Sequence, residues 1–103
     1  MPEVPEPVVV TMLWDDVADD LLAHLVRYVV MARQEEGCRN IDLCASVTVP
    51  GRVVVIAKWA SPAVQRAHFD GRAAVELAEA AHTLGVARPD MDLLESISAH
   101  DLT

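Results

Sequence analysis

Residues 49–69 read VPGRVVVIAKWASPAVQRAHF, and this stretch decides the fold of the chain. Its Pro50-Gly51 pair suits the two central positions of a type II turn, because proline presets φ and glycine accepts a positive φ. The next segment, 53–59, is mostly β-branched and apolar, as a buried strand requires. Ser61 is a good N-cap and Pro62 a good first helical residue. The stretch therefore predicts a turn, a strand and the start of a helix.

The part of the chain before this stretch predicts two further strands and a helix. Residues 7–14 are almost wholly apolar, which indicates a strand that is apolar on both faces. Residues 16–35 repeat aliphatic side chains at helical spacing, and Asp15 or Asp16 can cap this helix. Residues 38–49 alternate between apolar and polar side chains. The turn then joins them to the next strand as an antiparallel hairpin.

The part of the chain after it predicts a second helix and a fourth strand. The helix starts at Ser61, bends or breaks at Asp70-Gly71 and ends at Gly85, and the strand covers residues 91–99. The resulting order, β-α-β-β-α-β, is that of the ferredoxin-like split βαβ pattern. We therefore predict an α+β fold with an antiparallel sheet and both helices on one of its faces.

The strands at 7–14 and 53–59 carry apolar side chains on both faces, although the predicted helices cover only one face. A bare second face would be a large exposed apolar patch. A second copy of the chain would cover it, so we predict a homodimer. The domain that dimerises spans residues 8–99, with a flexible segment at 1–7 and a short tail at 100–103.

Charge and composition argue against several classes of partner. The chain has 8 basic and 16 acidic residues and a formal net charge of -8, which repels nucleic acid and anionic membranes. No apolar run approaches the roughly 20 residues that span a bilayer, and the start of the sequence does not read as a signal peptide, so we expect a cytoplasmic protein. Cys38 and Cys44 would lie about 20 Å apart on one strand, too far for a disulfide.

Three short motifs, in order along the chain, carry a resemblance to a known family. Residues 33–38 read RQEEGC, where the family has Arg-x-Glu-Pro-Gly-Cys between its first helix and second strand. The segment 59–61 reads WAS at the end of the third strand. Residues 63–68 read AVQRAH, which places His68 nine residues after Trp59. On these motifs the chain resembles the antibiotic biosynthesis monooxygenase (ABM) family of dimeric α+β barrel proteins.

The resemblance implies a function as well as a fold. Family members of known activity use no metal and no flavin, and they bind polycyclic phenols or quinols between the sheet and the helices. Oxygen reacts directly with the substrate anion. The resemblance therefore implies a cofactor-independent monooxygenase that acts on a small aromatic, phenolic or quinol substrate. The alternative is a non-catalytic homodimer of the same fold that binds a small ligand or regulates another process.

Several residues differ from those that the family uses. Val55 stands where its oxygenases have an asparagine, Ala57 where a glutamate is common, and Ile41 where an aromatic residue is often found. A related branch binds haem through a histidine of the second helix, but the matching residue here is Ala78, which has no donor atom. His82, one turn later, is displaced by about 6 Å. We therefore expect no haem, no other cofactor and no metal.

The catalytic candidates are His68, which stands at a position that many family members share, and Arg72, which follows Gly71. A histidine side chain titrates near neutral pH, so His68 could act as a general acid or base. Arg72 is an always-charged donor that could hold a carbonyl or phenolate oxygen of the substrate. The alternatives are a helical histidine whose nitrogens are satisfied by water or backbone, and a solvated surface arginine.

Four further residues are expected to bind the substrate. Trp59 could stack on a flat aromatic ring, and Trp14 and Phe69 could form walls of the same pocket. Val55 would face the substrate from the position of the family's asparagine. The alternative for Trp59 and Phe69 is ordinary packing in the core, and for Trp14 it is core packing or an interface.

Overall fold

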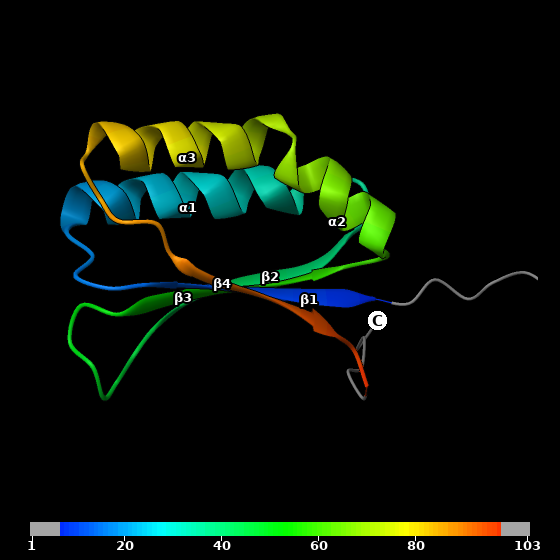
Figure 1. Cartoon of the computed structure of the whole chain (residues 1–103), viewed down its shortest axis with the longest axis horizontal. Coiled ribbons are helices and arrows are strands. Elements are labelled where there is room, and N and C mark those ends of the chain that lie inside the picture. Colours follow the sequence, from blue (N-terminus) through cyan, green and yellow to red (C-terminus); the bar gives the residue numbers. More distant parts are fainter. Residues whose placement is uncertain (1–6, 98–103) are drawn as a thin grey trace, which may run out of the picture.

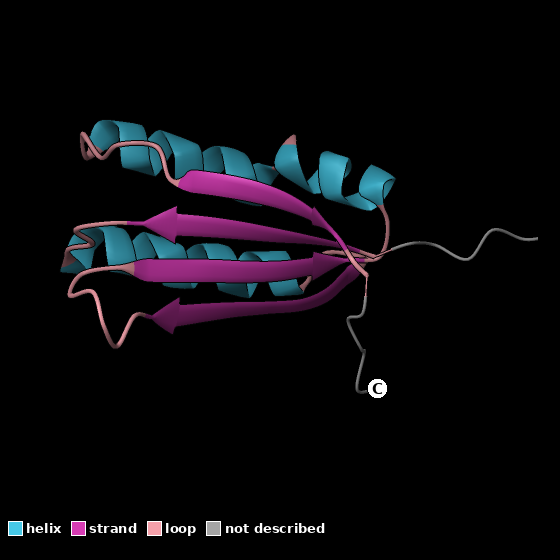
Figure 2. Ribbon diagram, turned by 60° about the horizontal axis from the view of Figure 1, so that its bottom comes forward, coloured by secondary structure: helices cyan, strands magenta, loops and turns pink. Residues whose placement is uncertain are grey.

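The computed structural model of the chain describes residues 7–97. The described elements are β1 (Val8–Trp14), α1 (Asp19–Arg33), β2 (Cys38–Ala45), β3 (Val53–Trp59), α2 (Pro62–Phe69), α3 (Arg72–Thr83) and β4 (Asp90–Glu95). The four strands form one sheet in the order β2-β3-β1-β4, and all neighbouring strands are antiparallel. The helices form a layer on one face of this sheet (Figures 1 and 2). The predicted α+β, ferredoxin-like fold is confirmed.

The core lies between the sheet and the helices. Alternate residues of the two central strands face the helices, because side chains along a strand point to opposite faces in turn. The helices contribute residues spaced three or four apart, which is one helical face. The buried apolar residues of these elements are Val8, Val10, Met12 and Trp14 on β1, Val53, Val55, Ala57 and Trp59 on β3, Leu21, Leu25, Tyr28, Val29 and Ala32 on α1, and Ala73, Leu77 and Ala81 on α3.

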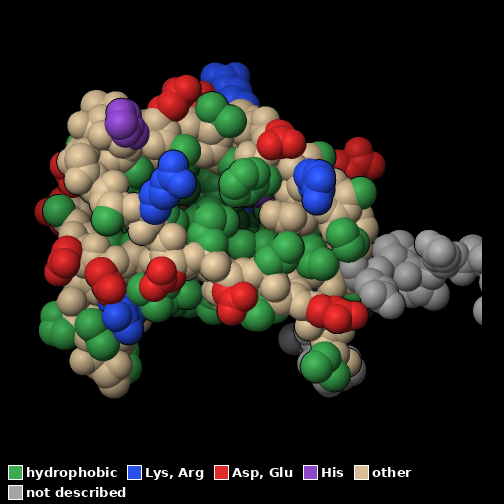
Figure 3. Space-filling model, viewed as in Figure 1, with side chains coloured by type: hydrophobic (Ala, Val, Ile, Leu, Met, Phe, Trp, Pro, Cys, Tyr) green, Lys and Arg blue, Asp and Glu red, His purple; other side chains and the backbone are tan. Residues whose placement is uncertain are grey.

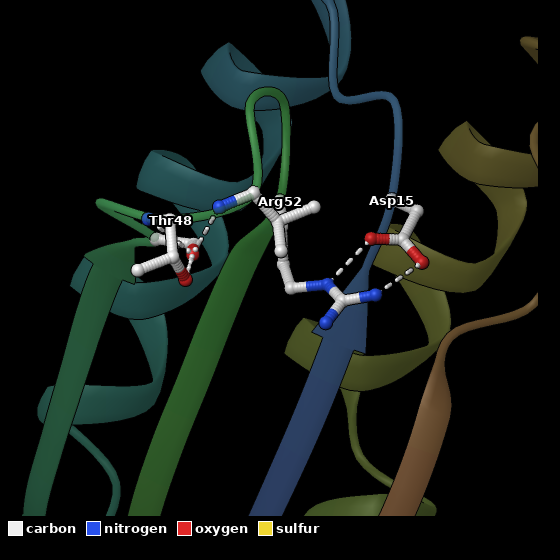
Figure 4. Close-up of polar contacts among 5 residues, drawn as sticks. Asp15, Thr48 and Arg52 are labelled. Carbon is white, nitrogen blue, oxygen red and sulfur yellow. Dashed lines mark hydrogen bonds and ion pairs between the residues drawn. The ribbon is translucent and has the colours of Figure 1, made fainter.

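The loop between β2 and β3 contains the predicted turn. Gly51 has φ +80°, and the backbone N–H of Arg52 donates to the carbonyl of Val49 at 3.2 Å. The guanidinium of Arg52 then donates to both carboxylate oxygens of Asp15, at 2.7 and 3.2 Å (Figure 4). These hydrogen bonds hold the pKa of the Asp15 carboxyl below its ordinary value. The loop is thereby fastened to the segment that follows β1.

The second strand is shorter than its sequence pattern predicts. It ends at Ala45 instead of Val49. The hydroxyl of Ser46 accepts hydrogen bonds from the backbone N–H groups of Thr48 and Val49, at 3.2 and 3.0 Å, and this turns the chain away from the sheet. Val47, which the alternation places on the core face, is 99% exposed. The backbone N–H of Ser46 still donates to the carbonyl of Arg52 at 2.9 Å, and beyond Ser46 local side-chain bonds replace strand pairing.

The first helix also differs from its predicted bounds, since it covers Asp19–Arg33 instead of residues 16–35. Its N-cap is Ala18, which has no side-chain capping bond, so neither Asp15 nor Asp16 is the cap. The backbone N–H of Val17 donates to the carbonyl of Gly51 at 2.9 Å, and Asp16 has φ +55°. The contact with the hairpin loop therefore keeps this segment out of the helix.

The predicted second helix is divided at Asp70-Gly71 into α2 and α3. The hydroxyl of Ser61 accepts from the backbone N–H of Val64 at 3.2 Å, which confirms the predicted N-cap. The helix α3 ends at Thr83, and β4 begins at Asp90, one residue before the predicted start. Residues 98 and 99 of the predicted fourth strand, and the expected end segments apart from Pro7, lie outside the described residues.

The second face of the sheet carries apolar side chains. Cross-strand partners share a face, so the residues that pair with the outward side chains of β1 also point outward. Ile56 and Leu94 on this face are 39% and 40% exposed. Within residues 7–97, no helix covers this face (Figure 1).

Candidate functional site

A pocket of about 780 Å³ lies between the sheet and the helices. Its floor is the helix-facing side of β1 and β3, and its walls come from α1, α2, α3 and the loop before β4. Some wall residues, such as Phe69 at 55% exposed, also reach solvent, so the pocket opens to the surface. Figure 3 shows a hollow with a hydrophobic floor and basic side chains at its rim. This size and lining suit a small, largely apolar ligand.

His68 is the most constrained polar side chain of the pocket. It lies on α2 and is 6% exposed. Its Nε2 lies 2.7 Å from the hydroxyl of Tyr28, and its Nδ1 lies 2.8 Å from Oε2 of Glu35. Its ring stacks on the indole of Trp59, with 4.1 Å between centroids. Both nitrogens of His68 therefore make hydrogen bonds to side chains. The alternative interpretation, in which water or backbone groups satisfy them, does not describe this histidine.

Tyr28 is the neutral end of these hydrogen bonds. Burial, and then the negative charge of Glu35, raises the pKa of Tyr28 well above its ordinary value, so Tyr28 stays protonated. When its hydroxyl donates to Nε2 of His68, Nδ1 carries the ring proton and donates to Glu35. When His68 is an imidazolium, both ring nitrogens donate, one to the oxygen of Tyr28 and one to Glu35. The side chain of Glu35 is 32% exposed, so the chain of hydrogen bonds runs from the pocket toward solvent.

Local sequence features bring these three residues together. Tyr28 belongs to the buried face of α1, and Glu35 follows soon after that helix ends. Gly37 then has φ +89°, and a Cβ at this position would lie 2.3 Å from Cγ1 of Val64 on α2. Only glycine lets the chain after α1 approach α2 this closely. That approach places Glu35 beside His68.

The structure brings together five of the six site residues that the sequence predicts. Trp14, Val55, Trp59, His68 and Phe69 all line the pocket. Trp14 and Trp59 are also core residues, at 3% and 1% exposed. Arg72 lies elsewhere: its side chain is 80% exposed, and its Nε donates to Glu76 at 2.9 Å.

Sequence reasoning missed other residues of this site. Tyr28 and Arg88 line the pocket, and Glu35 holds His68 from outside it. Glu35 lies within the motif at 33–38, so the sequence indicated that this residue matters. Nothing in the motif indicated that Glu35 contacts His68. His82 and Ala78, the two positions considered for a haem ligand, also line the pocket.

Comparison with a family model supplies the identification. The model of the family described as antibiotic biosynthesis monooxygenase matches residues 14–80, which is more than half of the chain. The chain belongs to this family. The match includes Tyr28, Glu35, Trp59 and His68, so the hydrogen-bonded chain lies within the ABM domain. No curated protein matches the sequence.

Solved structures share the fold of this ABM protein. Rv0793 from Mycobacterium tuberculosis superposes with a TM-score of 0.78 at 21% identity, covering 90% of this chain and 97% of its own. PA3566 from Pseudomonas aeruginosa gives 0.78 at 17% identity, with 94% and 100% covered. A variant of SnoaB, a cofactor-independent oxygenase from Streptomyces nogalater, gives 0.78 at 12% identity, with 91% and 96% covered. Identities this low show the common fold alone.

Among residues 7–97, every helix is too short or too polar to cross a membrane.

Proposed function

We propose that this ABM protein is a cofactor-independent monooxygenase acting on a small aromatic substrate, a phenol or quinol. One observation carries the proposal: a hydrogen-bonded chain, Tyr28–His68–Glu35, begins in the wall of an apolar pocket and ends at a partly exposed carboxylate. An apolar pocket binds flat rings, and the chain gives a phenolic proton a route out of it. Membership of a family that includes oxygenases supports the same reaction class.

The first chemical step is removal of the phenolic proton. The substrate hydroxyl donates to the oxygen of Tyr28 while the proton of Tyr28 passes to Nε2 of His68. His68 becomes an imidazolium paired with Glu35, and the substrate becomes an anion that accepts a hydrogen bond from Tyr28. Tyr28 is a phenol before and after the transfer, in keeping with its raised pKa. The imidazolium of His68 thus holds the proton close to the reacting anion.

The second step is oxygenation of the ring. Oxygen adds to the electron-rich carbon para to the ionised hydroxyl, and the resulting peroxide loses water. For a hydroxy-anthrone, one CH₂ group becomes a carbonyl, a four-electron oxidation that reduces one O₂ to the carbonyl oxygen and one water. The substrate supplies all four electrons, so the balance needs no further reductant. The imidazolium of His68 can return a proton through Tyr28 when the peroxide breaks down.

The alternative function is a non-catalytic homodimer that binds a small ligand or regulates another process. The positions Val55 and Ala57, where family members often carry polar residues, favour it, because neither can orient a substrate by hydrogen bonding. In both functions the sheet's outer face would be covered by a second copy of the chain. In both, we expect a cytoplasmic dimer.

Oxygen uptake separates the two functions. We would measure it with an electrode over a panel of quinols and hydroxy-anthrones, for the natural protein and for Tyr28→Phe, His68→Gln and His24→Gln. His24 is an exposed histidine of α1 outside the pocket and serves as the matched control. We expect at least one substrate to give uptake above the buffer rate, a loss of about 10²–10⁴-fold in the first two variants, and no change in the third.

Two results would point away from a monooxygenase. Ligands that raise the thermal stability of the protein while uptake stays at the buffer rate would favour the non-catalytic homodimer. Full uptake in folded His68→Gln would show that the hydrogen-bonded chain has no role in the reaction. Circular dichroism of each variant checks that the fold is retained.

A further inference from the structure

Helix α1 carries apolar side chains on more of its circumference than the core uses. Its buried residues, which pack into the core, are Leu21, Leu25, Tyr28, Val29 and Ala32. Leu22, Val26 and Val30 lie beside this buried face and are 37%, 49% and 49% exposed. Residues four apart are neighbours on one side of a helix, so these three form a row, which we call the α1 stripe.

The α1 stripe lies on the flank of the helix that points away from α3. The other flank lines a small groove with α3, where Nε of Arg27 lies 3.7 Å from Oε2 of Glu76, and Met31 belongs to the same groove. Successive residues of an α-helix are about 100° apart, so Val26 points roughly 100° away from Arg27 and roughly 140° away from Met31. Within residues 7–97, the stripe is therefore left open to solvent.

The stripe is continued at its two ends by residues of opposite charge. Asp19 lies three residues before Leu22, and Arg33 lies three residues after Val30. Spacings of three and four residues keep all five side chains on one side of the helix. Val26 is the midpoint of this row, with an apolar residue four positions away and a charged residue seven positions away in each direction. The row therefore has the same apolar pattern from both ends and opposite charges at its two ends.

The two end charges have no partner of opposite charge in the part of the chain that the structure describes. Asp19 is exposed and makes no ion pair or side-chain hydrogen bond there. Arg33 is also exposed, and its Nη2 donates to the carbonyl of Ile41 at 3.1 Å. This bond leaves four of the five N–H donors of the guanidinium. A second helix that brought its own Arg33 to Asp19, and its own Asp19 to Arg33, would pair all four charges.

We infer that the α1 stripe binds the α1 stripe of a second copy of the chain, with the two helices antiparallel about a two-fold axis at Val26. In this arrangement Val26 packs on Val26 of the second copy, and Leu22 packs on its Val30. Asp19 then lies beside Arg33 of the second copy, and the same pair forms again at the other end, as a two-fold interface requires. The stripe is separate from the outer face of the sheet and from the pocket lining, so the inference does not depend on the proposed function.

The contact is small, because each copy contributes three apolar side chains and two charges. Stable interfaces bury roughly 1,200–2,000 Å² in total, which is more than one short helix pair provides. We therefore expect weak association, visible at about 0.1–1 mM protein but not at micromolar concentration. It would join the proposed sheet-to-sheet dimers into larger assemblies, and it would join single chains if that dimer does not form.

Replacement of Val26 tests the stripe at its centre. Sedimentation velocity from about 10 µM to about 1 mM gives the average mass of the natural protein, Val26→Glu and Val47→Glu. Val47 is the control, since it is 99% exposed in the hairpin loop. We expect the mass of the natural protein and of Val47→Glu to increase about twofold over this range. The mass of Val26→Glu should not increase, because the two-fold axis brings its two carboxylates together.

Charge reversal tests the pairing at the ends of the stripe. Asp19→Arg and Arg33→Asp should each associate about tenfold more weakly than the natural protein, because like charges then meet at both ends. An equimolar mixture of the two variants should recover the natural affinity, since each supplies the charge that the other lacks. Asp20→Arg is the matched control: it changes the net charge equally, but on the flank of α1 toward α3, and it should associate at least as strongly as the natural protein.

An average mass that does not change with concentration in the natural protein would overturn the inference. Association that persists in folded Val26→Glu would do so as well, and so would a mixture that associates no better than either charge variant alone. Circular dichroism shows whether each variant is folded. Val26 is half exposed, so the result for Val26→Glu stands even if Arg33→Asp unfolds through loss of its hydrogen bond to Ile41.

Discussion

The imidazole of His68 lies over the indole of Trp59, with 4.1 Å between the ring centroids and 27° between the ring planes. The two residues come from consecutive elements, α2 and β3, and both are almost fully buried. The stack fixes the plane of the imidazole, and the hydrogen bonds to Tyr28 and Glu35 fix its rotation within that plane. His68 is therefore held in one orientation before any ligand binds.

Replacing Trp59 tests the stack. We expect Trp59→Ala to lower the free energy of unfolding by about 3–5 kcal/mol, because it leaves a cavity beneath a buried ring. Trp59→Phe keeps an aromatic face for His68 and should cost clearly less. Urea unfolding followed by circular dichroism measures both. If both variants lost the same free energy of unfolding, stacking of His68 on an aromatic ring would contribute nothing to stability.

Tyr28 makes the free energy of unfolding depend on pH in the alkaline range. Its pKa is raised in the folded protein, so the folded state holds this proton more tightly than the unfolded state does. The associated stability is complete below the unfolded pKa of about 10 and is lost as pH rises above it. We expect the stability difference between the natural protein and Tyr28→Phe to be constant from pH 7 to about pH 9.5 and to shrink above about pH 10. Urea unfolding across this range measures it, and a difference that stays constant up to pH 11 would contradict it.

The sequence predicts the parts of this fold that depend on local chemistry. Pro50-Gly51 and Ser61-Pro62 lie where the turn and the N-cap were expected, because their backbone preferences and capping bonds act over only a few residues. Residues 47–49 continue the apolar alternation of β2 but leave the sheet, because the hydroxyl of Ser46 accepts hydrogen bonds from the backbone N–H groups of Thr48 and Val49. Alternation alone does not reveal that competition.

The site was only partly predictable for a different reason. His68 and Trp59 are nine residues apart and belong to two adjacent motifs, 63–68 and 59–61, so the sequence could link them. Tyr28 and Glu35 reach His68 from 40 and 33 residues away, through the packing of α1 against the sheet and α2. No spacing in the sequence encodes such a contact. Arg88 was missed likewise, since it lines the pocket from the connection before β4, where the sequence has no periodic pattern that indicates which side chains face the core.

Gly37 controls the approach of α2 to the end of α1. Gly37→Ala would place a Cβ 2.3 Å from Val64 at a backbone φ of +89°. Gly85→Ala is the matched control, because Gly85 has φ +70° and a Cβ added there would meet no other atom within 4 Å. We expect Gly85→Ala to cost about 1–2 kcal/mol from backbone strain and Gly37→Ala to cost clearly more. Thermal unfolding measures both, and equal costs would mean that α2 shifts freely.

The outer face of the sheet gives a test of the proposed dimer. Ile56 lies on that face in the central strand β3 and is 39% exposed in the single chain. In a dimer whose sheets face one another, Ile56→Glu would bury an unpaired carboxylate in the interface. In a monomer the same change would be a surface substitution, worth within about 0.5 kcal/mol.

Val47→Glu is the control for the dimer test, since Val47 is 99% exposed in the hairpin loop. We expect sedimentation equilibrium at micromolar concentration to give a dimer for the natural protein and Val47→Glu, and a monomer for Ile56→Glu. The melting temperature of the two dimers should rise with protein concentration, because association stabilises the folded state by mass action. A folded monomer for the natural protein, with a melting temperature independent of concentration, would reject the dimer. The apolar outer face would then be exposed to solvent in the working protein.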